Sequence, residues 1–145
     1  MIRSALVYSV AALAIFLCVL GPTNAGAANQ AAVEQATKAA DTWLKLLDNG
    51  DYRACYQQSS EIVKDHLSED AFAHEFSAAR KPLGAVVSRT LKVAQYATSL
   101  PGAPDGQYVV MQYDTSFANK KSATETVTPM LDSDRQWRVS GYYIK

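Results

Sequence analysis

The chain has 145 residues, of which 14 are basic and 14 are acidic, so its formal net charge is zero. This balance lacks the strongly basic surface that nucleic-acid binding requires, and there is no acidic tail, so we expect no nucleic-acid partner. The length suits one ordinary domain, because domains commonly run to roughly 100–150 residues. No motif in the sequence identifies a reaction.

An apolar segment opens the chain. Arg3 supplies one positive charge, residues 5–20 form an apolar run that contains one serine, and Gly21-Pro22 ends the run. A bilayer span needs about 20 apolar residues, so this run is short for a membrane helix. A charged start, a short apolar run and small residues after it are typical of a secretory signal peptide.

Small residues follow the run at the two positions that a signal peptidase reads. Ala25 and Ala27 favour cleavage before Ala28, with cleavage after Ala25 as the second choice and an uncleaved N-terminal anchor as the alternative. We therefore expect residues 1–27 to be a signal peptide and residues 28–145 to be a single exported domain. That domain would be periplasmic or extracellular, with no stable membrane span after cleavage.

The first half of the exported domain is predicted to be helical. Apolar residues recur at helical spacing over residues 29–48, and the Asn-Gly pair at 49–50 ends this amphipathic helix. Asp51 can cap a short second helix, and Ser60 or Ser68 can begin the next one.

The second half is predicted to form strands, because it is rich in Val, Thr and Tyr and is divided by turn signals. Short links make neighbouring strands antiparallel, so the simplest sheet is a meander in chain order. The fold class is therefore α+β, with N-terminal helices packed on one face of a four-stranded antiparallel sheet. The predicted strands cover residues 86–98, 107–117, 123–131 and 136–144.

Alternation along the strands predicts which side chains face the helices. In the second strand Val109, Met111, Tyr113, Thr115 and Phe117 share one face, and loop lengths carry this register to the other strands. The register places two charged residues on this face, Glu125 opposite Thr115 and Tyr143, and Arg89 opposite Phe117, and it aligns Gln95 with Met111.

Arg89 and Glu125 therefore fall on a face that otherwise reads as core. An unpaired buried charge would cost several kcal/mol, so we expect a direct or ligand-bridged pair. Thr115, Tyr143 and Gln95 would supply the surrounding hydrogen bonds, and the five residues form a candidate ligand-binding site. The alternatives are a structural ion pair, or a slipped register that leaves both charges in solvent.

The remaining chemistry-bearing residues give weaker signals. Cys55 is the one cysteine left after removal of the signal segment, so no internal disulfide is possible and we expect a buried thiol. His66, Asp70 and His74 are spaced four apart, but a predicted helix start lies between them. We therefore expect no metal, no cofactor and no catalytic residue among them.

Motifs along most of the domain carry a resemblance to a known family. The Trp-Leu pair at 43–44 and residues 48–52 belong to them, as do residues 80–84, 88–89, 100–110, 115–121, 125–127 and 137–142. With these motifs the chain resembles DUF4019, a family of bacterial exported proteins of unknown function. Cys55-Tyr56 departs from the pattern, where a small residue and a tryptophan are expected.

The resemblance implies no activity, because none is assigned to the family. Its helix-then-sheet layout is similar to the cone-shaped cystatin-like and nuclear-transport-factor-like folds, whose concave sheet often holds a pocket, and that likeness concerns fold alone. The expected function is a non-enzymatic module that binds a small polar ligand or an envelope protein through the concave face, anchored by Arg89 and Glu125.

Two alternatives stay open. Glu125 could act as the general base of a small enzyme if burial raised its pKa. The protein could instead have a purely structural or assembly role, with the cone filled by its own side chains. An open pocket around Glu125 would support binding or catalysis, whereas a packed interior would count against both.

Overall fold

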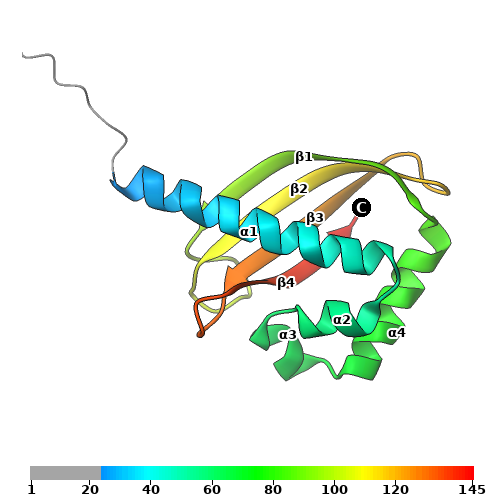
Figure 1. Ribbon diagram of the computed structural model, residues 1–145, viewed down its shortest axis with the longest axis horizontal. Coiled ribbons are helices and arrows are strands. Elements are labelled where there is room, and N and C mark those ends of the chain that lie inside the picture. The colour runs from blue at the N-terminus through cyan, green and yellow to red at the C-terminus, as the bar shows by residue number, and fades with distance from the viewer. Residues whose placement is uncertain (1–23) are drawn as a thin grey trace, which may run out of the picture.

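The computed structural model describes residues 24–145, so most of the predicted signal peptide lies outside the described residues. Helices come first and strands follow, as the sequence predicts (Figure 1). The helices are α1 (Asn24–Asp48), α2 (Tyr52–Gln57), α3 (Glu61–His66), α4 (Glu69–Arg80) and the short 3₁₀ helix η1 (Lys81–Leu83). The strands are β1 (Val86–Ala97), β2 (Tyr108–Phe117), β3 (Ala123–Leu131) and β4 (Trp137–Ile144).

The long helix α1 lies across one face of the sheet (Figure 1). Its apolar residues recur every three or four positions, so they form one stripe that packs on the sheet. Burying a large apolar side chain contributes roughly 1.5–3 kcal/mol, so this stripe is a main source of stability. The buried residues of the stripe are Ala36, Ala40, Trp43, Leu44 and Leu47.

The breaks between helices follow the local chemistry. Gly50 adopts a positive φ of 72°, which suits glycine and ends α1. The Asp51 side chain accepts a hydrogen bond from the Ala54 amide at the start of α2, and the Ser68 hydroxyl accepts one from the Ala71 amide at the start of α4. The helices α2 and α4 therefore begin where the local sequence predicts, and α4 ends at Arg80, next to the sheet.

The four strands form an antiparallel meander in the order β1-β2-β3-β4, which confirms the predicted fold class. The strand limits agree with the prediction to within one residue. The face toward α1 holds the buried apolar residues Val109, Met111, Phe117, Val127 and Val139. The space between α1 and the sheet is therefore filled by the protein's own side chains.

The predicted register is wrong in detail, because β2 and β3 pair two residues away from the prediction and because β1 and β4 contain bulges. Arg89 pairs with Thr115 and Glu125 with Tyr113, each two residues from the prediction, and a shift of two keeps a side chain on the same face. Arg89 and Glu125 therefore still face α1. At a bulge one extra residue enters one strand, and every side chain beyond it changes face.

Two predicted site residues are displaced in this way. An irregularity between Leu91 and Val93 in β1 turns Gln95 to the outer face, where it is exposed. In β4 a register shift at Ser140 puts Tyr143 opposite Thr126, and the Tyr143 side chain is 64% exposed. Gln95 and Tyr143 therefore lie away from Glu125, contrary to the predicted constellation.

Candidate functional site

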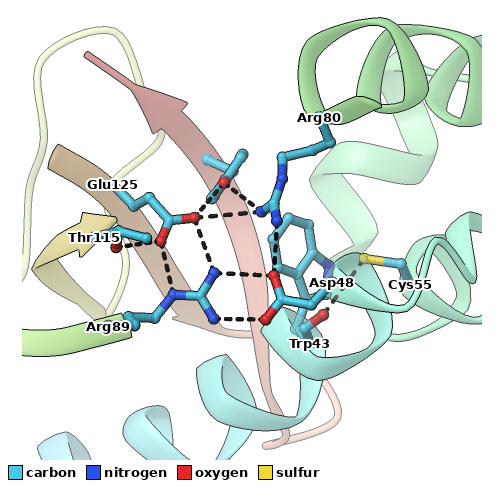
Figure 2. A network of polar contacts seen from close by, with 8 residues as sticks. Trp43, Asp48, Cys55, Arg80, Arg89, Thr115 and Glu125 are labelled. Atoms are coloured by element: carbon cyan, nitrogen blue, oxygen red, sulfur yellow. Dashed lines mark hydrogen bonds and ion pairs between the residues drawn. The ribbon is translucent and has the colours of Figure 1, made fainter. Parts of the chain in front are cut away.

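The structure brings together three of the five predicted site residues, Arg89, Thr115 and Glu125. Glu125 is the centre of the arrangement, and none of its surface is exposed. Its Oε2 accepts hydrogen bonds from Arg89 Nε at 2.7 Å and from the Thr115 hydroxyl at 2.5 Å. Of the two arrangements that the sequence left open, a direct or a ligand-bridged pair, the structure has the direct Arg89–Glu125 ion pair (Figure 2).

Tyr142 takes the place that the sequence assigned to Tyr143. The register shift in β4 turns Tyr142 toward α1, where its ring packs 5.3 Å from the Trp43 ring, measured between centroids. Its hydroxyl donates to Glu125 Oε1 at 2.5 Å and accepts from Arg80 Nη1 at 2.9 Å. The hydroxyl thus uses both its donor and an acceptor lone pair within the network.

Asp48, the last residue of α1, supplies a second carboxylate. Arg89 grips it with two hydrogen bonds, Nη1 to Oδ2 at 2.7 Å and Nη2 to Oδ1 at 3.0 Å, and Arg80 Nη2 donates to Oδ1 at 2.8 Å. Figure 2 shows Arg89 held between Asp48 and Glu125. The Asp48 side chain is 23% exposed, so this end of the network reaches the surface.

Arg80 closes the network from α4. Its side chain is 5% exposed and its guanidinium carbon lies 4.8 Å from the centroid of the Phe117 ring, a cation–π arrangement. Nη1 also lies 3.4 Å from Glu125 Oε1. Its Nε is buried and has no hydrogen-bond partner among the described residues. The network therefore comprises Asp48, Arg80, Arg89, Thr115, Glu125 and Tyr142.

The network is electrically balanced, because two guanidinium groups face two carboxylates. Burial raises the pKa of Glu125, but hydrogen bonds from Arg89, Thr115 and Tyr142 outweigh it, and the net pKa is lowered. The pKa of Asp48 is lowered too, because the hydrogen bonds from Arg89 and Arg80 outweigh its burial. Both carboxylates are therefore charged at neutral pH, and the four charges compensate one another.

This environment counts against the alternative in which burial makes Glu125 a general base. A base that works near neutral pH needs a raised pKa and access to a substrate proton. Glu125 has a lowered pKa, is fully buried and already accepts bonds on both oxygens. The interior around it is packed rather than open.

An open groove borders the network on its exposed side. It has a volume of about 800 Å³ and runs between the end of α1, the turn into α2, and the far end of α4. Asp48 and Arg80 form part of its wall. The remaining lining residues are Leu47, Asn49, Gly50, Tyr52, Ala73, His74, Ser77, Lys81, Gly84 and Ala85.

The network lies inside a segment that a family model recognises. The model of DUF4019, described as a protein of unknown function, matches residues 39–142. The chain belongs to the DUF4019 family. No curated protein and no solved structure matches it, so the likeness to cystatin-like and nuclear-transport-factor-like folds stays a prediction.

Cys55 is buried in this DUF4019 domain, as its sequence neighbours indicate. None of its surface is exposed, and its Sγ lies 3.7 Å from the Trp43 carbonyl oxygen, as a donor. Burial raises the pKa of the thiol, which is the opposite of what a nucleophilic thiolate needs. Cys55 therefore packs as a small apolar residue.

Within residues 24–145 no metal-binding constellation forms. His66 ends α3, whereas Asp70 and His74 belong to α4, and no three His, Cys, Asp or Glu side chains are grouped to hold an ion. In the same part of the chain, no helix is long and apolar enough to cross a membrane.

Sequence reasoning missed Asp48, Arg80 and Tyr142. The first two come from helix ends, and only the tertiary fold carries them to the sheet. One signal was available for Asp48, because an acid in the last turn of a helix faces the negative end of the helix dipole and needs a compensating partner. Nothing local distinguished Tyr142 from Tyr143, because the bulge beside them decides which one faces inward.

Proposed function

We propose that this DUF4019 protein is an exported, non-enzymatic module that binds a small polar ligand in the groove beside the network. One observation carries the proposal: Arg80 and Asp48 line the groove, Asp48 is bound there by the guanidinium groups of Arg80 and Arg89, and Arg80 Nε is buried without a partner among the described residues. Buried polar groups are nearly always hydrogen-bonded, so an unmet donor on a residue that lines a groove favours a ligand site.

In this proposal the predicted anchors have different roles. Arg89, which is 15% exposed, would face the ligand, and Glu125, which is fully buried, would hold Arg89 in place from behind. Thr115 would fix the Glu125 carboxylate. Gln95 and Tyr143, on the outer face, would take no part. The proposed site would thus be lined by helix residues and by the turns that follow α1 and precede β1, rather than by the concave face of the sheet.

Export is part of the proposal. Arg3, the apolar run at 5–20 and the small residues before Ala28 support secretion to the periplasm or beyond. The lowered pKa of Glu125 and the buried Cys55 support a binding role over an enzymatic one.

A purely structural role is the second candidate, and the packed interior favours it. The network ties the ends of α1 and α4 to β1, β3 and β4 through side chains alone, as an internal clamp would. In that case the groove would hold nothing specific.

The two candidates differ in what the exported protein carries. We would express the full chain, purify the protein from the exported fraction and identify bound small molecules by native mass spectrometry. If the groove binds a ligand, the wild type should carry a bound small molecule. Lys81→Gln, at the groove, should reduce the bound amount, and Lys92→Gln, on β1, should leave it unchanged. If both variants and the wild type carry the same species, or none, the groove is not the binding site.

A further inference from the structure

The two carboxylates of the network differ in how freely they could leave it. Glu125 is fully buried and accepts bonds from β1, β2 and β4 side chains, whereas the Asp48 side chain is 23% exposed and is held by the two arginines alone. Asp48 also ends α1, where the helix dipole disfavours a negative charge. Asp48 is therefore the carboxylate that can move out.

We propose that the Asp48 carboxylate occupies the binding position of an external carboxylate, at the N–H groups of Arg80 and Arg89; we call this position the seat. The ligand of the groove would be a small carboxylate-bearing molecule that displaces Asp48 from it. This inference rests on the proposed function and specifies its ligand. Three N–H groups converge on the Asp48 oxygens, Arg89 Nη1 and Nη2 at 2.7 and 3.0 Å and Arg80 Nη2 at 2.8 Å. Two parallel bonds from one guanidinium match the planar shape of a carboxylate.

The seat would survive the departure of Asp48. Glu125 holds Arg89 through Nε at 2.7 Å and Nη2 at 3.1 Å, and holds Arg80 through Nη1 at 3.4 Å. Tyr142 also accepts from Arg80 Nη1. Both guanidinium groups thus stay oriented by buried partners, and preorganised groups bind at lower cost than mobile ones.

The charge of the groove favours an anion once Asp48 turns away. Asp48 is the one acid among the described residues that line the groove, whereas Arg80 and Lys81 line it as cations. Two guanidinium groups would then face a single carboxylate, Glu125, leaving one positive charge uncompensated. Arg80 Nε, which is buried and has no partner among the described residues, adds a further unmatched donor to the same guanidinium group.

The volume suits a small molecule. Ligand pockets usually measure roughly 300–1,000 Å³, and the groove, at about 800 Å³, lies in this range. Tyr52 and Ser77 on its walls offer hydroxyl groups to the rest of the ligand.

Calorimetric titration of the exported protein with N-acetylglycine tests the proposal. Because Asp48 competes for the seat, wild-type affinity is reduced by the fraction of molecules in which the seat is free. We expect weak, on the order of millimolar, binding to the wild type, and Asp48→Ala should bind about 10-fold or more tightly. Asp41→Ala, on the exposed face of the same helix, is the matched control and should bind as the wild type does.

Two further compounds test whether the site selects a carboxylate over a neutral amide and over another anion. The neutral N-acetylglycinamide should not bind, and inorganic phosphate should bind more weakly than N-acetylglycine. Preferred binding of phosphate would overturn the carboxylate assignment. Binding of N-acetylglycine to Asp48→Ala but not to the wild type would also overturn the proposal, because it would show only that a created cavity can be refilled.

A wild-type measurement covers the case in which Asp48→Ala does not fold. The side-chain carboxyl ¹³C resonance of Asp48 should shift on addition of N-acetylglycine and stay fixed with N-acetylglycinamide; an unchanged resonance at saturating N-acetylglycine contradicts displacement. The proposed function could still stand in that event. If a neutral molecule co-purifies with the wild type and Lys81→Gln reduces its bound amount, the groove is still a binding site, and only the proposal of a carboxylate ligand is wrong.

Discussion

The protein contains two ion pairs that have nearly equal nitrogen–oxygen distances but differ strongly in solvent exposure. Arg53 and Glu69 join α2 to α4 with an Nε–Oε1 distance of 2.6 Å, and the Arg53 side chain is 80% exposed. Arg89 and Glu125 join β1 to β3 at 2.7 Å, and Glu125 is fully buried. Solvent competes for the first pair, whereas the second must be satisfied by the protein alone.

The comparison shows that the number of hydrogen-bond partners of a carboxylate matters more for stability than the length of any one bond. The Glu69 carboxylate has two side-chain partners, Arg53 and Gln57, and can turn to water if either is lost. The Glu125 carboxylate depends on four side chains from α4, β1, β2 and β4, and it is buried away from bulk solvent. Removing a member should therefore cost little in the exposed pair and much in the network.

The largest effect is expected for Glu125→Ala. Two arginines would then share only Asp48, and Thr115 and Tyr142 would lose their acceptor, so the free energy of unfolding should fall by about 3–5 kcal/mol. Urea unfolding followed by circular dichroism measures the change. A loss within about 1 kcal/mol would show that water reaches the network and would remove the contrast with the exposed pair.

Acid should also weaken the network, with a smaller loss of unfolding free energy than Glu125→Ala causes. The pKa values of Glu125 and Asp48 are lowered by folding, so the unfolded chain binds protons first and stability is lost as pH falls below their ordinary values of 4.5 and 3.8. Glu125→Gln should flatten this part of the stability profile. Urea midpoints measured from neutral pH down to acid check the slope, and an equal slope in wild type and variant would locate the acid sensitivity elsewhere.

Tyr142→Phe and Tyr143→Phe test the register shift in β4. Loss of the Tyr142 hydroxyl removes one donor to Glu125 and one acceptor for Arg80, so unfolding free energy should fall by roughly 1–2 kcal/mol. Tyr143→Phe, on the outer face, should change it by less than about 0.5 kcal/mol. The reverse order would support the unbulged register that the sequence predicted.

The smallest effect is expected for Glu69→Ala in the exposed pair. Its loss should change the unfolding free energy by at most about 1 kcal/mol, and the difference from wild type should shrink as salt is added. Thermal unfolding at low and high ionic strength measures both. A larger, salt-independent loss would mean that this pair also supports the packing of α2 on α4.

The sequence predicted the elements well and their side-chain pairing only in part. Helical spacing over residues 29–48 and the Val- and Thr-rich runs after Gly84 located α1 and the four strands, because these signals are local. Gln95 and Tyr143 were misplaced because no local pattern announces the extra residues in β1 and β4. A bulge depends on how two strands fit each other, which is a non-local property.

By itself the sequence determined an α+β fold, a meander sheet, membership of the DUF4019 family and two charges on the core face. The fold class, the sheet order and the two charges on the core face follow from periodicity and turn chemistry, which act within a few residues, whereas the family follows from motifs spread along the domain. Only the tertiary structure decided that Asp48 and Arg80 complete the charge balance and that Tyr142 replaces Tyr143. The physical reason is that a buried charge must find its partners in space, and the ends of α1 and α4 reach Arg89 and Glu125 only after the helices pack on the sheet.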